Sequence, residues 1–395
     1  MPQLPQGFQA AGVHCGIKTD PSKPDIALIV SDEPVSAAGV YTQNLVCAAP
    51  VLLDRERTPS DQIRAVITNS GNANACTGEQ GKKDCQSMTE LTAAACDIAP
   101  EQVLVMSTGI IGHTLDMQKI ENGINDAATQ LASDTNALNA AAAGIMTTDT
   151  VEKIASTTIS LGSETAMVTG IAKGSGMISP NMATMLAVVM TDASLTAEQA
   201  QSILNQATAR SFNRISVDGH ASTNDTLLLL ASGKVGEALT SEQLAEVQNA
   251  VEQVCIDLAK AIVNDGEGAE HLIEIKVTGC ESEADAETIC RAIANSPLVK
   301  TAVTGCDPNW GRIVSAAGYA GPKFEPTNVS LSMNGVRIYD QGAPLEFDAE
   351  GVSQTMRDNR TVLIELSVGT GPGKCTFWTC DLTTGYVHIN ADYST

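Results

Sequence analysis

Short apolar runs, each bounded by polar or turn residues, punctuate the first half of the chain. Those at 26–30, 65–68 and 103–106 are four or five residues long, a length typical of strands buried within a sheet. Between the last two, residues 87–98 predict a helix with four apolar side chains on one face, namely Met88, Leu91, Ala95 and Ile98. This half therefore predicts strands connected by a helix.

Helices are easier to recognise in the second half, because two of them start with a capping box. In this motif a threonine and a glutamine three residues later each bond the other's backbone N–H. Thr196 with Gln199, and Thr240 with Gln243, have that spacing. The second pair precedes a buried stripe at helical spacing, formed by Leu244, Val247, Val251, Val254, Leu258 and Ile262. A third helix is predicted at about 284–295.

Most of the remaining apolar segments alternate with polar residues or are short, and predict strands. Asn334-Gly335 separates two of them and is the strongest short signal for a β-hairpin. The predicted strands are 271–277, 299–303, 329–333, 336–339, 362–368 and 386–389. Strands and helices in these numbers favour an α/β protein, and we expect a layered αββα sandwich in which sheets pack face to face beneath helices.

Length and charge narrow the class of protein. A chain of 395 residues exceeds the usual size of one hydrophobic core, so we expect two lobes or one large sandwich. Lys and Arg total 23 against 46 Asp and Glu, a formal net charge of −23. This excess of acid argues against nucleic acids and anionic membranes as partners. No apolar run approaches the roughly 20 residues that span a bilayer, and the N-terminus lacks the pattern of a signal peptide.

Cysteine usage points to a reducing compartment. The eleven cysteines are odd in number, and no two have the C-x-x-C spacing. Most stand in Ala- or Val-rich segments, where cysteine behaves as a small apolar residue. We therefore expect a cytoplasmic protein and no metal site.

The most informative segment is 173–186, which reads Lys-Gly-Ser-Gly-Met-Ile-Ser-Pro-Asn-Met-Ala-Thr-Met-Leu. By composition alone it indicates a glycine-rich turn that enters a strand. Thr184 gains a second interpretation if the chain is cut before it. An N-terminal threonine carries an α-amine with a pKa of about 7.7–8.0, which can take the proton of its own hydroxyl. Before the cut, the same hydroxyl can attack the Ala183 carbonyl.

This segment resembles the self-cleavage site of ornithine acetyltransferases, the bifunctional glutamate N-acetyltransferase family of arginine biosynthesis. The resemblance covers essentially the whole chain, because further blocks similar to the family occur in order at 10–18, 69–78, 107–112, 307–312 and 390–395.

The resemblance implies a self-processing protein of the N-terminal-nucleophile-like type. Cleavage between Ala183 and Thr184 would give an α chain, 1–183, and a β chain, 184–395, that assemble as α2β2. Thr184 would take the acetyl group of N2-acetyl-ornithine and pass it to glutamate in a ping-pong reaction. No cofactor is implied. Some members of the family also accept acetyl-CoA as a substrate, and the sequence leaves open whether this chain does.

The family's functional residues can be transferred to matching positions. Thr108 and Gly109 match the pair that stabilises the oxyanion. The residues that match contacts to the substrate are Thr147, Lys173, Thr184, Glu267, Asn390 and Thr395. At the first of these positions Thr148 could serve instead.

Two features depart from the family pattern. His220 and Ala221 stand where an aspartate and a hydroxyl or apolar residue are expected, which leaves the role of His220 undetermined, and Cys306 before Asp307 is also unusual. Two other classes of function stay open. A related hydrolase or aminopeptidase would share Thr184 but use water as acceptor. A binding or structural protein would remain uncut and tolerate loss of Thr184.

Overall fold

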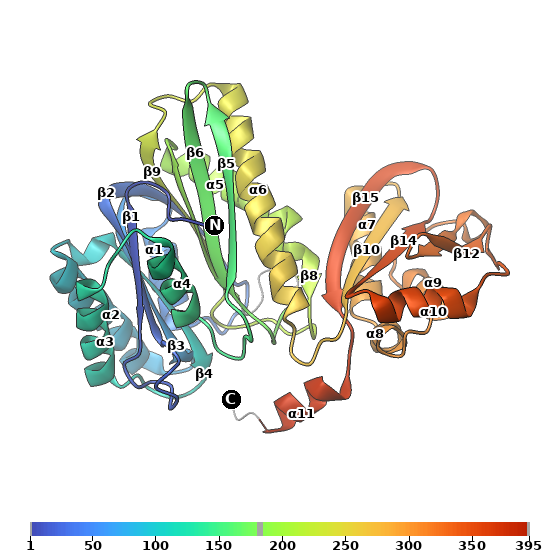
Figure 1. Cartoon of the computed structure of the whole chain (residues 1–395), viewed down its shortest axis with the longest axis horizontal. Helices are drawn as coiled ribbons and strands as arrows, with labels where there is room; N and C mark the ends of the chain where they lie inside the picture. Colours follow the sequence, from blue (N-terminus) through green and yellow to red (C-terminus); the bar gives the residue numbers. More distant parts are fainter. Residues whose placement is uncertain (1, 180–184, 393–395) are drawn as a thin grey trace. The chain divides into compact units, whose positions relative to one another are not determined.

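The computed structural model describes residues 2–179 and 185–392, and these form two compact units. The first consists of Met1–Asn213 and His220–Ile262, and the second of Arg214–Gly219 and Val263–Ser394. Each unit has its own sheet and its own hydrophobic core (Figure 1). The predicted mixed α/β class with two sheets and covering helices is therefore confirmed.

The sheet of the first unit has eight strands in the order β4-β3-β2-β9-β7-β6-β5, with β1 paired to β2. The β3–β4 and β7–β9 pairs are parallel, and the other pairs are antiparallel. The strands are β1 (Phe8–Val13), β2 (Ile26–Tyr41), β3 (Ser60–Asn72), β4 (Val103–Ile110), β5 (Lys153–Leu161), β6 (Glu164–Lys173), β7 (Leu186–Ala193) and β9 (Thr226–Val235). The segments predicted at 26–30, 65–68 and 103–106 lie in β2, β3 and β4.

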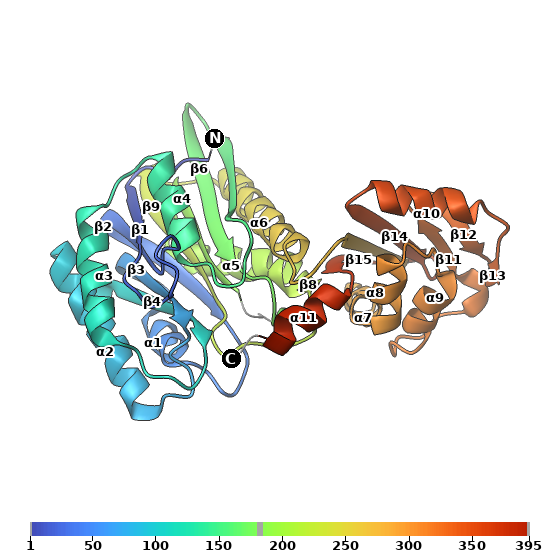
Figure 2. The ribbon, with the colours of Figure 1, turned by 60° about the horizontal axis from the view of Figure 1, so that its bottom comes forward.

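Alternating side chains of this sheet build cores on both faces. On the β2–β4 part, one face packs against α4 and the other against α2 and α3, which lie on its outer side (Figures 1 and 2). Both predicted capping boxes form, at the starts of α5 and α6. The helices are α1 (Ala49–Arg57), α2 (Gly78–Cys96), α3 (Met117–Thr129), α4 (Thr135–Gly144), α5 (Ala197–Arg210) and α6 (Ser241–Asn264), with short 3₁₀ turns at Pro100–Gln102 and Phe212–Arg214.

The second unit has a seven-stranded sheet in the order β13-β12-β11-β14-β10-β15-β8. Its core includes side chains of β10, β11, β14 and β15 together with side chains of α7, α9 and α10. The strands are β8 (Ile215–Ser216), β10 (Leu272–Gly279), β11 (Ser330–Met333), β12 (Val336–Asp340), β13 (Ala343–Pro344), β14 (Thr361–Ser367) and β15 (Gly371–Cys380). The helices are α7 (Glu283–Ala294), α8 (Pro297–Thr304), α9 (Trp310–Gly318), α10 (Ala349–Asp358), α11 (Thr384–Asp392) and a 3₁₀ turn at Pro326–Asn328.

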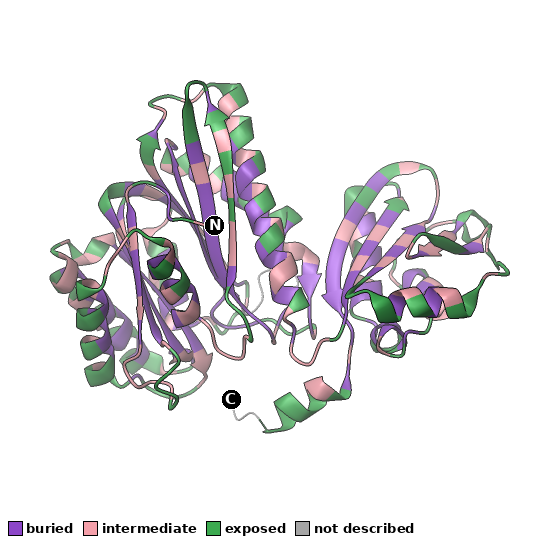
Figure 3. Ribbon diagram, in the orientation of Figure 1, coloured by how far each residue is buried: buried purple, intermediate pink, exposed green. Residues whose placement is uncertain are grey.

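The predicted hairpin is present, and two predicted strands are wrong. Asn334 and Gly335 join β11 to β12 with positive φ angles of 46° and 82°, as a tight hairpin turn requires. Residues 299–303 belong to α8 rather than to a strand, and residues 386–389 belong to α11. Figure 3 shows that α11 is largely exposed, whereas most residues of the strands are buried.

Candidate active site

Three residues predicted to act in the site, Ala183, Thr184 and Thr395, lie outside the described residues. The described residues that flank these positions form the rest of the predicted site. On the N-terminal side of the cleavage position stands Lys173, the last residue of β6. On the C-terminal side stands Met185, directly before β7. Strands β6 and β7 are antiparallel neighbours, with Lys173 paired to Leu186.

The predicted oxyanion pair lies at the end of β4, where two glycines bring neighbouring strands very close. Gly109 pairs with Gly71 of β3 and has a φ of +132°, which favours glycine. A Cβ atom on Gly109 would lie 2.2 Å from the Gly71 carbonyl carbon, so no other residue fits. Thr108 is 3% exposed, and its hydroxyl forms no hydrogen bond within the described part of the chain. That hydroxyl is available to a ligand.

Asn224, just before β9, fixes the end of β4, which carries this pair, and the residue that follows β3. Its side-chain amide donates to the backbone carbonyl of Ala73, at 2.6 Å, and to that of Ser107, at 2.8 Å. Asn224 is 5% exposed. Because Ser107 directly precedes Thr108, these bonds set where the oxyanion pair stands relative to β9.

A buried carboxylate, Asp149, connects the predicted Thr147 and Lys173 regions. Its Oδ1 accepts hydrogen bonds from the Lys153 ammonium and the Gly174 N–H, both at 2.7 Å, and its Oδ2 accepts from the Thr147 N–H at 2.9 Å. Burial alone would raise the pKa of Asp149, but the charges of Lys173 and Lys153 and these bonds outweigh it and lower the pKa to about 2. The carboxylate therefore stays ionised, bonds Lys153 directly and balances the charge of Lys173.

The neighbouring threonine also lies in this cluster. The Thr148 hydroxyl donates to the Ser175 hydroxyl at 3.5 Å, while the Thr147 backbone is fixed by Asp149. Both threonines thus lie near Lys173, and the choice between them as a substrate contact stays a prediction.

Replacing Asp149 with asparagine should destabilise the protein at neutral pH. The side chains of Asp149 and Lys153 are 0% and 1% exposed, so the change leaves buried ammonium charge without its carboxylate, a loss of about 3–5 kcal/mol in the free energy of unfolding. Since the folded pKa lies below the ordinary value, this stabilisation is present above about pH 4 and is lost as the pH falls toward 2. Urea unfolding at pH 7 and pH 3 measures it.

A matched control uses an exposed ion pair of similar length. Glu79 and Lys82 are joined at 2.7 Å on the surface of α2, where solvent screens the charges. Glu79→Gln should leave the unfolding midpoint almost unchanged at both pH values. Equal effects of the two substitutions would contradict the role given to Asp149.

Met185 is held from two sides at the start of β7. Its backbone N–H donates to the Asp225 carboxyl at 3.1 Å, and its carbonyl accepts from the Thr226 N–H at 3.1 Å. Met185 and Asp225 are 1% and 0% exposed. Asn224 and Asp225 are adjacent, so one short segment fixes both the oxyanion strand and the backbone directly after Thr184.

Lys18 joins the same cluster, although only its place in a family-like block pointed to it. Its side chain packs over Gly71, since a Cβ there would lie 3.5 Å from the Lys18 Cγ. Burial lowers the pKa of Lys18 to about 8, against the opposing charges of Asp25 and Asp149. Lys18 therefore adds a cation near the glycine that pairs with Gly109.

The second unit brings together two other predicted contacts. The Asn390 amide, on α11, donates to the Glu267 carboxylate at 2.8 Å. Gly268, with a φ of +71°, lets the start of α11 approach, because a Cβ there would lie 2.4 Å from the Tyr386 nitrogen. The Tyr386 hydroxyl in turn donates to Asp218 at 3.3 Å. Glu267 and Asn390 are thus neighbours, and their role as substrate contacts stays a prediction.

Three residues of the site could not be found from the sequence, and His220 acquires no role. The side chains of Asn224 and Asp225 bond partners 40 to 151 positions away, and Asp149 bonds Gly174, 25 positions away, as well as its near neighbours Thr147 and Lys153, so no local pattern marks the three residues as a group. The only hint to Asp149 in the sequence was that Thr147, a predicted substrate contact, lies two residues before it. His220 is exposed, five positions before Asp225.

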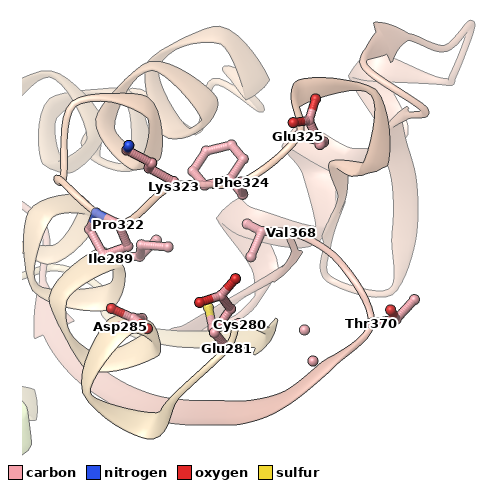
Figure 4. Close-up of a pocket in the computed structure, with 12 residues that line it drawn as sticks. Cys280, Glu281, Asp285, Ile289, Pro322, Lys323, Phe324, Glu325, Val368 and Thr370 are labelled. Atoms are coloured by element: carbon pink, nitrogen blue, oxygen red, sulfur yellow. The ribbon is translucent and has the colours of Figure 1, made fainter.

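A separate cavity of about 330 Å³ lies in the second unit (Figure 4). Its apolar side chains are Ile289, Phe324 and Val368, and charged groups such as Glu281 and Lys323 also line it. None of the residues predicted for acetyl transfer lines this cavity, so it is not part of the predicted site.

Within 2–179 and 185–392, no three or more His, Cys, Asp or Glu side chains are grouped so as to hold a metal ion. Over the same residues, none of the helices has the length and apolar character needed to span a bilayer. All eleven cysteines are free thiols.

Comparison with known proteins gives a consistent family. The ArgJ family model matches residues 9–395. The arginine biosynthesis bifunctional protein ArgJ of Rhodopirellula baltica is 49% identical over 99% of this chain and 96% of its own length. The crystal structure of ArgJ from Bacillus halodurans is 39% identical, with a TM-score of 0.50, and covers 51% of this chain and 96% of that chain.

A further solved relative is an ornithine acetyltransferase from Mycobacterium tuberculosis, complexed with ornithine. It is 36% identical, with a TM-score of 0.40, over 46% of this chain and 94% of that chain. With the family model and the full-length relative matching nearly from end to end, this chain belongs to the ArgJ family, the ornithine acetyltransferases that its sequence resembles.

Proposed function

We propose that this protein transfers the acetyl group of N2-acetyl-L-ornithine to L-glutamate through an ester on Thr184. The observation that carries the proposal is the pair Asn224–Asp225, which links the Thr108 strand to the Met185 amide. Thr184 is covalently joined to Met185, so a nucleophile at that position starts from a backbone fixed relative to the oxyanion pair.

Cleavage between Ala183 and Thr184 would free the α-amine that activates this nucleophile. It would cut between β6 and β7, which stay joined by their ladder. The β-chain strands β7 and β9 lie between the α-chain strands β2 and β6, so the cut chains would share one sheet. The solved Bacillus halodurans chain supports the cut, because it is about half as long as this chain, as either product would be.

The reaction is balanced in two half-reactions. The Thr184 hydroxyl oxygen attacks the acetyl carbonyl carbon, and its proton passes to the α-amine. The oxyanion receives hydrogen bonds from the Thr108 hydroxyl and the Gly109 N–H. The bond to the ornithine nitrogen breaks, and that nitrogen takes the proton from the α-ammonium. The glutamate amine then attacks the ester and gives a proton to the α-amine, the bond to the Thr184 oxygen breaks, that oxygen takes the proton back from the α-ammonium, and N-acetylglutamate leaves.

The charged side chains near the site support amino-acid substrates, which carry a carboxylate and an amine. Lys18 and Lys173 gather cationic charge near the oxyanion pair in a chain whose net charge is −23, and so favour a substrate carboxylate. Glu267, together with Asn390, offers a carboxylate and an amide to an amino-acid ligand. Thr147 or Thr148, and Thr395, complete the proposed contacts.

The assembly and the compartment belong to the same proposal. We infer an α2β2 tetramer in the cytoplasm, in keeping with eleven free thiols. The names of the relatives include the word bifunctional, which favours acetyl-CoA as a second donor.

A donor comparison tests the function. Purified protein with glutamate as acceptor should form N-acetylglutamate from N2-acetyl-ornithine, and ornithine should appear in equal amount. Acetyl-CoA in place of acetyl-ornithine should also give N-acetylglutamate if the enzyme is bifunctional. Release of free acetate without N-acetylglutamate would contradict transfer and indicate a hydrolase.

A further inference from the structure

Cys306, the cysteine that departs from the family pattern, stands in the second unit beside a histidine that a carboxylate orients. Its thiol sulfur lies 4.0 Å from Nε2 of His271. The other ring nitrogen of His271, Nδ1, lies 2.9 Å from Oδ2 of Asp381. A nucleophile, a base and a group that orients the base are thus neighbours, and none of the three is among the residues predicted for acetyl transfer.

Asp381 is held on its other oxygen, and this arrangement decides where the proton of the His271 ring lies. Oδ1 of Asp381 accepts the backbone N–H groups of Glu270, at 2.9 Å, and of His271, at 3.0 Å. A carboxylate accepts hydrogen bonds and donates none, so the neutral His271 ring carries its proton on Nδ1. Nε2, the nitrogen that faces Cys306, therefore has a lone pair that can take a proton.

The backbone carbonyl of Met356 favours the protonated form of that ring. Its oxygen lies 3.2 Å from Nε2 of His271, where it accepts a hydrogen bond only after Nε2 has gained a proton. With Asp381 at Nδ1, an imidazolium has an acceptor at each of its two nitrogens. A proton that passes from the Cys306 thiol to His271 thus enters a ring whose charged form is stabilised on both sides.

The Cys306 thiol keeps its proton until it reacts. Burial raises the pKa of this thiol, and the negative charges of Asp381 and Glu270 raise it further, against the opposing charge of Arg357. Because the thiolate is the nucleophile and the thiol is not, attack requires a base that removes the proton at the moment of reaction. His271 is a base within reach.

The backbone around Cys306 decides which class of electrophile the thiol suits. The N–H of Cys306 donates to the Val303 carbonyl and that of Asp307 to the Ala302 carbonyl, both at 2.9 Å. Acyl transfer needs free donors for an oxyanion, and these two N–H groups are already bonded. Attack on a sulfur atom of a disulfide forms no oxyanion. Cys306 keeps 8% of its surface exposed, which a small disulfide can approach.

We propose that Cys306 is a site of S-thiolation, at which a low-molecular-weight disulfide exchanges with a thiol activated by His271 and Asp381. The Cys306 proton passes to Nε2 of His271, and the thiolate attacks one sulfur of the disulfide. The bond between the two disulfide sulfurs breaks, a new S–S bond forms to Cys306, and the released thiolate takes the proton from His271. The products are a mixed disulfide on the protein and one small thiol, so no further oxidant is needed.

Oxidised glutathione, with mass-spectrometric mapping of the modified peptides, tests this in the wild-type protein. Cys280 is the matched thiol, since it lies in the same unit, is 5% exposed, and has a pKa that burial also raises. It even lines the cavity of Figure 4, but in the described residues no histidine bonds its thiol. Cys306 should be modified about 10-fold faster than Cys280, or more. Equal rates at the two thiols would overturn the inference.

His271→Asn separates the role of the base from the fold of the second unit. Asparagine keeps an amide N–H for Asp381 but has no group at the place of Nε2. The rate at Cys306 should fall by about 10²-fold, the lower end of what a general base contributes, while the rate at Cys280 stays the same. An unchanged rate at Cys306 would contradict the inference. If the variant opens the second unit, both rates should rise together, and the comparison of Cys306 with Cys280 in the wild type then decides.

Discussion

Thr184→Ala should remain one uncut polypeptide of 395 residues and transfer no acetyl group. The hydroxyl is the proposed attacking group in both cleavage and acetyl transfer, so alanine removes both reactions at once. Denaturing electrophoresis measures the first effect, and formation of N-acetylglutamate measures the second. Loss of a catalytic nucleophile lowers turnover by several orders of magnitude.

The wild type and a conservative variant serve as controls. Wild-type protein should run as two bands under denaturing conditions, with Thr-Met-Leu-Ala at the start of one, yet elute as one species in native size exclusion. The chains should stay together because β7 pairs with β6 and β9 pairs with β2, so strands of the α chain flank the β7–β9 pair on both sides. Thr184→Ser keeps a hydroxyl and should be cut. Acetyl transfer by Thr184→Ala would end the assignment.

Local patterns predicted those elements of the fold in which propensity and burial agree. Thr196 and Thr240 cap α5 and α6 as expected, and Asn334-Gly335 forms the hairpin. The prediction failed at 299–303 because a run of apolar residues was taken as a strand despite helix signals beside it. Ser296 caps α8 and Pro297 occupies its first turn, while Val299, Ala302 and Val303 share its buried face.

The second failure has a different cause. Residues 386–389 alternate only weakly, and in α11 Val387 and Ile389 are 62% and 39% exposed. Without a buried face the apolar pattern carries no periodic signal, and it cannot distinguish a strand from a helix. The helix instead follows the turn made by Thr383, which bonds Gly268 at 2.6 Å across a separation of 115 residues.

The residues of the site also fall into two groups, those that a sequence pattern marks and those that only the fold brings to light. Thr108, Gly109 and Lys173 stand in recognisable blocks, and in the structure Thr108 and Lys173 are buried and Gly109 has a positive φ, while their roles stay predictions. Asp149 and Asp225 stand out only through what folding brings to them, namely charges and N–H groups from distant strands. A sequence pattern records neighbours along the chain, whereas a pKa depends on neighbours in space.

Thr108→Val should lower kcat for acetyl transfer by about 10²–10³-fold, which corresponds to about 2.7–4 kcal/mol of transition-state stabilisation. Valine has the shape of threonine without the hydroxyl, so the substitution removes a donor and leaves the packing of β4 in place. Because the Thr108 hydroxyl bonds no other described residue, its loss should not weaken the fold. Steady-state kinetics with acetyl-ornithine and glutamate measure the effect.

Thr68→Val is the matched control, since Thr68 is buried to a similar degree on the neighbouring strand β3, two positions before the Ser70 that pairs with Thr108. It should leave kcat unchanged and the unfolding temperature close to that of Thr108→Val. If both valine variants lost activity equally, the loss would reflect packing of the sheet. If neither did, the developing oxyanion would have to be stabilised by the Gly109 N–H alone, and Thr108 would lose its place in the mechanism.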